Sequence, residues 1–235
     1  MFADESNYLK KLNQINDAII ISASGNKHSI EIAKNLKKFN PKLLTCNENA
    51  KAKEYIKKEN FHLFPKNREP YTYNCSTYLN MIIAKTKEDP KEILNFIKSL
   101  DKSLINFKKF NSFYFIIPKE FDNVREMALN KFDELFGSII SARVFTLEQT
   151  KHAKTVVNSK KELFISLGYE NKLFGINRLN LPLPKDANYG TIISIIYYII
   201  GKIQKQNKPY FKNSIIEYTK QSSKIFNQNI NPIVE

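Results

Sequence analysis

Hydrophobic and polar positions along the chain alternate between two repeating patterns. Short apolar runs at 17–22, which is β-branched, and at 42–46 and 61–64 are typical of strands buried in a parallel sheet. Between them, residues 29–39 and 50–59 carry apolar side chains at helical spacing. This alternation predicts a parallel sheet with helices packed on its faces.

The same alternation continues to the C-terminus. Helical spacing also precedes the first strand, at 7–16, and the segment 138–145 fits either a continued helix or a strand. The remaining predicted helices are 71–85, 90–103, 123–136, 189–204 and 214–226, and the remaining strands are 112–117, 163–167 and 177–183. We therefore expect an α/β fold, a three-layer αβα sandwich with parallel sheets, in two tandem subdomains at 1–110 and 111–235.

Composition narrows the class of partner. The chain has 235 residues, 42% of them hydrophobic, and a net charge of +14. The positive charges are nearly all lysines without a long basic block, so an anionic small ligand fits at least as well as nucleic acid, which is not expected. The most apolar stretch, 191–203, is short for a membrane span and contains Lys202. The N-terminus lacks the pattern of a secretory signal, so a cytoplasmic protein is expected.

The loop Ser22–Lys27, with the sequence Ser-Ala-Ser-Gly-Asn-Lys, joins the first predicted strand to a helix. Backbone amides and the positive end of the helix dipole meet at such a junction. The hydroxyls of Ser22 and Ser24 add donors, Gly25 permits a tight turn, and Asn26 and Lys27 add an amide and a positive charge. The pattern predicts a phosphate site, and simple capping of the helix by Ser24 or Asn26 is the alternative.

This loop resembles the phosphate loop of SIS (sugar isomerase) domains, in which a strand leads through Ser-x-Ser-Gly-x-Thr into a helix. Ser22 and Ser24 match that motif, and Lys27 stands where the threonine is usual. The segment 69–77 resembles the Glu…Ser-Thr segment of the family, which places Ser76 and Thr77 beside the sugar. The resemblance implies SIS-like subdomains and a phosphorylated sugar as ligand.

The second half resembles the second SIS domain of two-domain isomerases, including the archaeal-type phosphoglucose/phosphomannose isomerases. By that resemblance Glu134, with Asp133 as an alternative, would move the proton between carbons. His152, in the segment that begins at Glu148, would help to open the sugar ring. Glu134 could equally be an exposed helix residue, and Glu148 and His152 a surface pair at i and i+4.

A lysine near the C-terminus assists in these enzymes by stabilising the enediolate oxygen. Lys220 is the closest match, and Lys212 and Lys224 compete with it. Proton transfer of this kind requires no metal and no organic cofactor. The remaining histidines, His28 and His62, are expected to be structural or exposed.

The chain also departs from the family pattern. No Gly-rich turn precedes Ser22, and 117–120 reads Ile-Pro-Lys-Glu where a glycine turn is typical. We therefore expect either an abridged member without the first strand-loop unit or a site completed by a partner. The resemblance implies a homodimer with the site near the subunit interface. Two functions stay open: an aldose–ketose isomerase acting on a hexose 6-phosphate, and a non-catalytic phosphosugar-binding or regulatory module.

Overall fold

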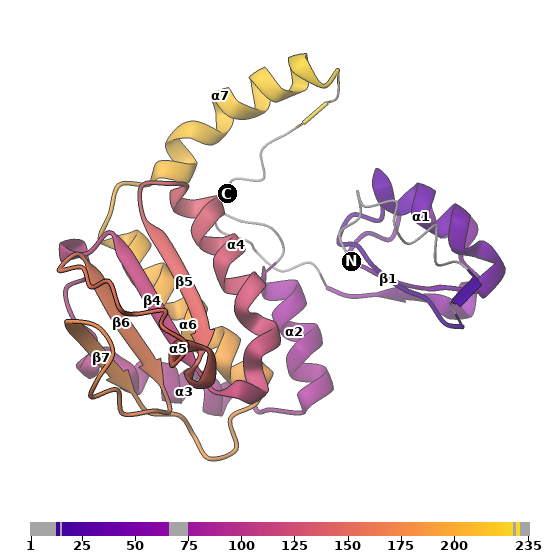
Figure 1. Cartoon of the computed structure of the whole chain (residues 1–235). Helices are drawn as coiled ribbons and strands as arrows, with labels where there is room; N and C mark the ends of the chain where they lie inside the picture. Colours follow the sequence, from indigo (N-terminus) through magenta and orange to yellow (C-terminus); the bar gives the residue numbers. More distant parts are fainter. Residues whose placement is uncertain (1–12, 15, 66–74, 228, 231–235) are drawn as a thin grey trace. The chain divides into compact units, whose positions relative to one another are not determined.

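The chain forms two compact units in a computed structural model that describes residues 13–14, 16–65, 75–227 and 229–230 (Figure 1). By contacts, the described residues up to 65 and residues 75–77 belong to the first unit, and the described residues from Tyr78 onward belong to the second. The predicted helix at 7–16 falls almost entirely outside the described residues. The subdomain boundary expected at residue 110 stays a prediction.

The first unit is built on three parallel strands in the order β1-β2-β3. Ile20 of β1 is in register with Leu43 of β2, and both side chains are buried beneath α1, which contributes Ala33 and Leu36. These elements are β1 (Ile19–Ile21), α1 (His28–Leu36), β2 (Lys42–Thr45) and β3 (Phe61–Leu63).

The helix predicted for 50–59 is wrong. Two short 3-10 segments occupy this stretch, Lys51–Tyr55 and Lys58–Asn60. Of the apolar residues at 51–59, only Ala52 is buried. Tyr55 and Ile56 are only partly buried against the core of the unit. This small buried area does not offset the cost of forming an isolated helix, so the segment follows the surface of the unit in tight turns.

The second unit contains a four-stranded sheet in which all strands are parallel, in the order β5-β4-β6-β7. The ambiguous segment 138–145 is a strand over most of its length. This strand is β5 (Ser141–Thr146), and the other strands of the sheet are β4 (Ser112–Ile117), β6 (Glu162–Leu167) and β7 (Asn177–Leu181).

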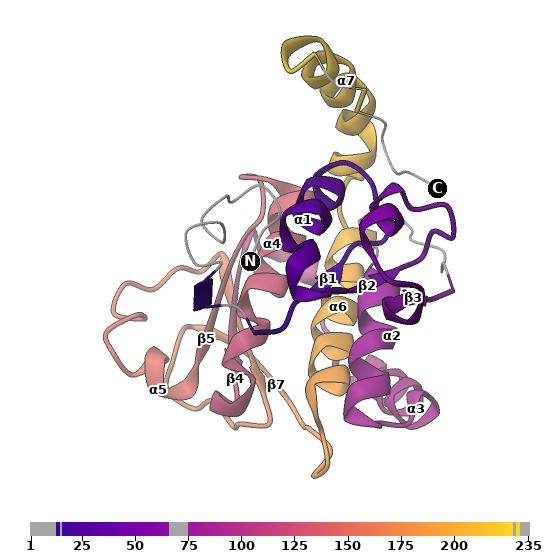
Figure 2. The same cartoon turned by 90° about the vertical axis from the view of Figure 1, so that its right-hand side faces the viewer.

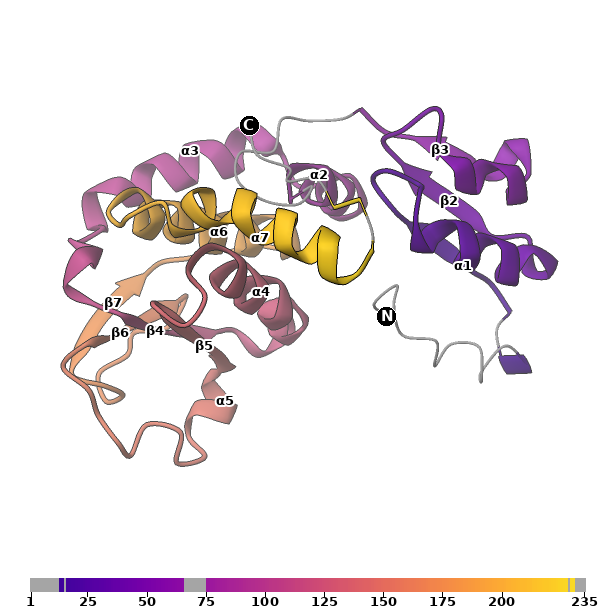
Figure 3. The same cartoon turned by 90° about the horizontal axis from the view of Figure 1, so that it is seen from above.

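One face of this sheet carries the main hydrophobic core. Phe113, Phe115 and Leu163 project from it into a cluster that includes Phe132 of α4 and Ile196 of α6. Figures 2 and 3 show the helices gathered on this side of the sheet. They are α2 (Cys75–Thr86), which joins this unit from Tyr78 onward, α3 (Pro90–Leu100), α4 (Arg125–Phe136) and α6 (Tyr189–Lys205). The last helix, α7 (Tyr210–Ile225), packs on this core through its first residues and then projects away from the sheet (Figure 1).

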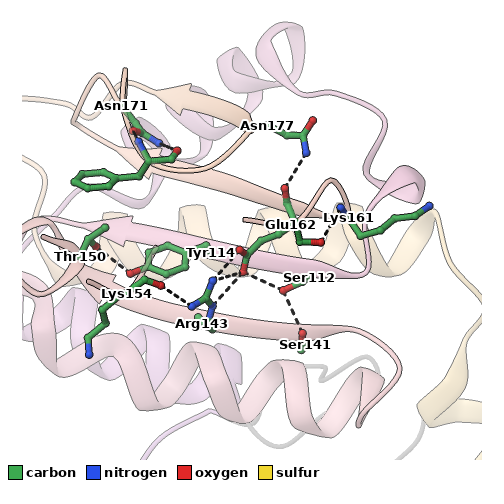
Figure 4. A network of polar contacts seen from close by, with 12 residues as sticks. Ser112, Tyr114, Ser141, Arg143, Thr150, Lys154, Lys161, Glu162, Asn171 and Asn177 are labelled. Carbon is green, nitrogen blue, oxygen red and sulfur yellow. Dashed lines mark hydrogen bonds and ion pairs between the residues drawn. The ribbon is translucent and has the colours of Figure 1, made fainter. Parts of the chain in front are cut away.

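The opposite face carries the short helix α5 (Leu147–Thr150) and a polar network (Figure 4). Arg143 of β5 forms a bidentate ion pair with the buried Glu162 of β6, with N–O distances of 2.7 Å. Ser112 of β4 donates to the same carboxylate at 3.1 Å. Beside this network the ring of Tyr114 stacks on that of Phe164. Ionic and aromatic contacts therefore join the three strands on this face.

The predicted fold class is confirmed: the chain is α/β, with parallel sheets flanked by helices. Core and strand bounds follow the apolar runs closely because parallel strands buried by helices are almost continuously hydrophobic. Across the described residues, the helices are all too short or too polar to span a bilayer.

Candidate functional site

The predicted phosphate loop follows β1 at the carboxyl edge of the first sheet. The amide of Gly25 donates to Ser22 Oγ at 3.2 Å, and the amide of Asn26 donates to Ser24 Oγ at 3.3 Å. Both hydroxyl oxygens therefore act as acceptors within the turn. Each hydroxyl retains its own proton, so both remain able to donate to a ligand.

The second strand holds this loop in place. Asn47 donates from Nδ2 to the carbonyl oxygen of Ser24 at 2.8 Å, and Thr45 donates to the carbonyl oxygen of Ala23 at 3.1 Å. The sequence analysis did not single out Thr45 and Asn47. The available signal was their position at the carboxyl end of β2, because the ends of neighbouring parallel strands meet at one edge of a sheet.

Gly25 has a φ of +61°, and a Cβ placed on it would lie 2.3 Å from the Cβ of Ala50. Any side chain at this position would collide with the methyl group of Ala50, just before the 51–55 segment. The glycine therefore serves close packing as well as the positive φ.

The start of α1 lacks a side-chain cap. Its N-cap residue is Lys27, which makes no capping hydrogen bond and has a φ of 54° and a ψ of −125°. The amides of Lys27 and His28 have no hydrogen-bond partner among the described residues. Capping of α1 by Ser24 or Asn26, the alternative reading of the loop, is therefore wrong. A strained residue and unused donors at a helix start are features that binding sites retain.

Ser76 and Thr77 lie in the first turn of α2, but their side chains fall outside the described residues. Their predicted contact with a sugar stays a prediction. His28 and His62 are both exposed, in agreement with the expectation for these histidines.

Glu134 and His152 lie at opposite ends of β5. Glu134 is in the last turn of α4, which leads to the amino end of that strand, whereas His152 follows α5 beyond its carboxyl end. Glu134 forms an ion pair with the nearly buried Lys131 on the same helix. One copy of the second unit thus does not bring the two predicted catalytic side chains together.

The other predicted catalytic residues are exposed. Glu148 pairs with Lys151 at 2.7 Å, and the hydrogen bond and charge of that lysine lower the pKa of the Glu148 carboxyl. Lys220 is exposed on α7. Asp133 and Glu134 line a 560 Å³ groove together with residues of α7. The roles assigned to these residues stay predictions.

No protein-family model matches this sequence, and no curated protein matches it by sequence. Solved structures do match. Glucosamine-6-phosphate deaminase from Thermotoga maritima superposes with a TM-score of 0.63 at 15% identity, over 87% of this chain and 74% of that one. Tagatose-6-phosphate ketose/aldose isomerase from Escherichia coli gives 0.57 at 12% identity, over 81% and 69%. The C-terminal domain of glucosamine-fructose-6-phosphate aminotransferase from Francisella tularensis gives 0.54 at 12%, over 80% and 69%.

The chain shares their fold. At such low identities the likeness concerns the fold, and function has to be argued from the site.

Proposed function

We propose that the chain is a SIS-type protein that binds a phosphorylated sugar through the serine loop, residues Ser22–Lys27. The observation that carries the proposal is the uncapped start of α1 beside two serine hydroxyls with unused protons. Amides, hydroxyls and the Lys27 ammonium all donate hydrogen bonds, and a phosphate group accepts them. The fold shared with three proteins named for sugar phosphates supports the same ligand class.

The finer proposal is an aldose–ketose isomerase that acts on a hexose 6-phosphate through an enediolate. Glu134 would carry the proton between the two carbons, and His152, in the segment with Glu148, would open the ring. Lys220 would stabilise the negative oxygen. Because Glu134 and His152 lie at opposite ends of β5, a homodimer is part of this proposal, with one of these residues supplied by each copy.

Binding is tested by titrating the full chain with fructose 6-phosphate and comparing it with Lys27→Gly. Glycine accommodates the positive φ of this residue, so the variant removes the ammonium while relieving strain. We expect an affinity loss of about tenfold or more, as for a lost charge-assisted contact. Lys87→Gly is the matched control, since Lys87 also has a positive φ, of 62°. Equal affinities in the two variants would count against the phosphate site.

Turnover is tested in a coupled assay with fructose 6-phosphate on the wild type and on Glu134→Gln. If the chain is an isomerase, Glu134→Gln should lose turnover and still bind fructose 6-phosphate. Glu126 is an exposed glutamate at the start of the same helix, and the control variant Glu126→Gln should stay active. Mixing Glu134→Gln with His152→Ala should restore part of the activity, because some mixed dimers then contain one intact site. No restoration would refute the shared site.

The second candidate is a non-catalytic phosphosugar-binding module. It is favoured by the contact between Glu134 and Lys131 and by the separation of Glu134 from His152. Tight binding without turnover in the wild type, with any of several hexose phosphates, would establish this function in place of the isomerase.

A further inference from the structure

Two connections of the second unit cross the polar face of its sheet without forming a long helix. They are the first return, residues 147–161 between β5 and β6, and the second return, residues 168–176 between β6 and β7. Because all four strands are parallel, each return runs from the carboxyl ends of the strands back to their amino ends. Such a crossover usually contains a helix that covers the sheet. Here the first return contains only the four-residue α5, on the side of the sheet opposite α4 and α6 (Figure 3).

The inner side of both returns is fixed to the sheet and to the other return. Phe174 packs on the aromatic cluster of the polar face. Arg143 of β5 donates to the carbonyl oxygen of Lys154 at 3.0 Å (Figure 4). Asn177 joins the two returns, because its Nδ2 donates to the carbonyl oxygen of Lys160 at 3.1 Å. The outer sides of the two returns therefore belong to one surface of the second unit.

This outer side exposes four large aliphatic side chains. Val157 is the most exposed large hydrophobic residue of the described chain, at 86%, and its neighbour Val156 is 74% exposed. On the second return Leu173 is 73% exposed and Ile176 is 52% exposed. Exposed apolar residues are usually scattered singly, so four of them on two joined segments indicate an interaction surface.

Basic side chains lie among these aliphatic residues. Between 153 and 178 the exposed charged residues are five basic ones and a single acid, Glu170, because Glu162 is buried in its ion pair. Lys160 and Lys161 form no ion pair with any residue that the structure describes. The surface is therefore positive as well as apolar. Its five basic residues are Lys154, Lys160, Lys161, Lys172 and Arg178.

This chemistry favours a lipid membrane as the partner. Surfaces that bind single-stranded nucleic acid stack bases on aromatic rings, whereas the exposed apolar residues here are all aliphatic. A bilayer combines anionic headgroups with an apolar interior, so it satisfies lysines and aliphatic side chains together. The long lysine side chain also keeps its ammonium among the headgroups while its methylene groups lie deeper.

We propose that this loop surface, residues 154–161 and 172–178, docks the protein on an anionic membrane. Val156 and Val157 enter the apolar boundary of the headgroup layer, and the lysines bind lipid phosphates and carboxylates. Lys160 and Ile176 lie next to the amino ends of β6 and β7, whereas small ligands of parallel sheets bind at the carboxyl ends. Docking is thus a separate function that does not rest on the proposed function of the serine loop.

The test is co-sedimentation of the full chain with vesicles of phosphatidylcholine alone and with vesicles that contain about one third phosphatidylserine. We expect binding to the anionic vesicles only, and weaker binding as the salt concentration rises. The double variant Val156→Ser/Val157→Ser should bind about tenfold more weakly or worse, because it removes the apolar groups that leave water. The matched control Leu94→Ser/Ile216→Ser replaces two exposed aliphatic residues on α3 and α7, and it should bind like the wild type.

A second pair of variants tests the charge. Lys160→Gln/Lys161→Gln should weaken binding to the anionic vesicles by about tenfold or more. Lys57→Gln/Lys58→Gln is the matched control, because these lysines are also adjacent and exposed but belong to the first unit. It lowers the net charge of +14 by the same amount, so wild-type binding by this control would show that the position of the lysines matters.

Three results would overturn the proposal. The first is a wild type that does not bind the anionic vesicles. The second is a valine variant that binds them like the wild type, which would leave only the general attraction of a basic protein to anionic lipid. The third is equal loss of binding in either control. A valine variant that keeps vesicle binding but changes its oligomeric state, or loses binding to a DNA oligonucleotide, would assign the surface to a second copy or to nucleic acid instead.

Discussion

Glu88 gives the most direct test of how the second unit is held together. Its carboxylate lies at the start of α6 and accepts five hydrogen bonds. The amides of Asn188, Gly190 and Thr191 donate at 3.0, 2.7 and 2.9 Å, and the hydroxyls of Thr86 and Thr191 both donate at 2.6 Å. A residue before α3 thus occupies the anion-binding end of a helix about one hundred residues later.

Glu88→Gln keeps the size of the side chain but replaces one acceptor oxygen with an amide that donates. Hydrogen bonds to a charged group contribute about 1.5–3 kcal/mol each, and they are not additive. Glu88 is only partly buried, so water can replace some of the lost contacts. We therefore expect the variant to lower the free energy of unfolding of the second unit by about 2 kcal/mol at pH 7.

The effect should depend on pH. Burial alone would raise the pKa of Glu88, but the hydrogen bonds from Thr191, Thr86 and the amides outweigh it and hold that pKa below its ordinary value. A lowered folded-state pKa means that the stabilisation is complete above the unfolded pKa, about 4.3, and is lost as the pH falls through the folded value. The difference between wild type and Glu88→Gln should therefore be constant from pH 7 to 5 and shrink below pH 4.

Urea unfolding at several pH values measures this difference, and hydrogen exchange of the first turn of α6 reports it locally. Glu92→Gln is the matched control, an exposed glutamate in the first turn of α3. A difference under about 0.5 kcal/mol at pH 7, or one that does not change down to pH 3, would refute the reasoning.

Two further substitutions test other contacts. Gly25→Ala should lower the free energy of unfolding of the first unit by about 2 kcal/mol or more, because the new Cβ meets Ala50. Gly137→Ala, with open space around its Cβ, should cost only about 1 kcal/mol, for its positive φ. Equal costs in urea unfolding would contradict the contact with Ala50. Glu162→Gln should cost about 2 kcal/mol, because it weakens the bidentate pair with Arg143 while the guanidinium remains; unchanged thermal unfolding would show that the pair contributes nothing.

Most strands and helices could be predicted from the sequence, because the residues that they bury follow short local patterns of hydrophobicity. The strand at 112–117 contains an unbroken apolar run from Phe113 to Ile117, and the structure buries every residue of that run. The segment 138–145 could not be assigned as a helix or a strand from the sequence. Its two isoleucines are followed by a serine and an arginine, a pattern that fits neither the helical nor the strand period of hydrophobic residues. In the structure 141–146 pairs as a strand with β4, and Arg143 reaches across β4 to Glu162 of β6, nineteen residues later.

The serine loop was predicted from its residues, but the hydrogen bonds within its turn were not. Sequence could name Ser22 and Ser24 as donors; the structure adds that both oxygens already accept from the turn. The positive φ of Lys27 left no trace in the sequence, since lysine is an unusual residue there.

Several carboxylates of the second unit are held in contacts within the fold, so the net charge of the chain alone does not indicate which ligand it binds. Glu88 is enclosed by donors at the start of α6, Glu162 is paired with Arg143, and Asp101 accepts from Tyr198 and Lys202. These acids hold the fold together and can do little for ligands. Most lysines remain at the surface, where they attract anions without specifying one. In the proposed serine-loop site, specificity would come from the two serine hydroxyls and the amides that surround Lys27 at the start of α1.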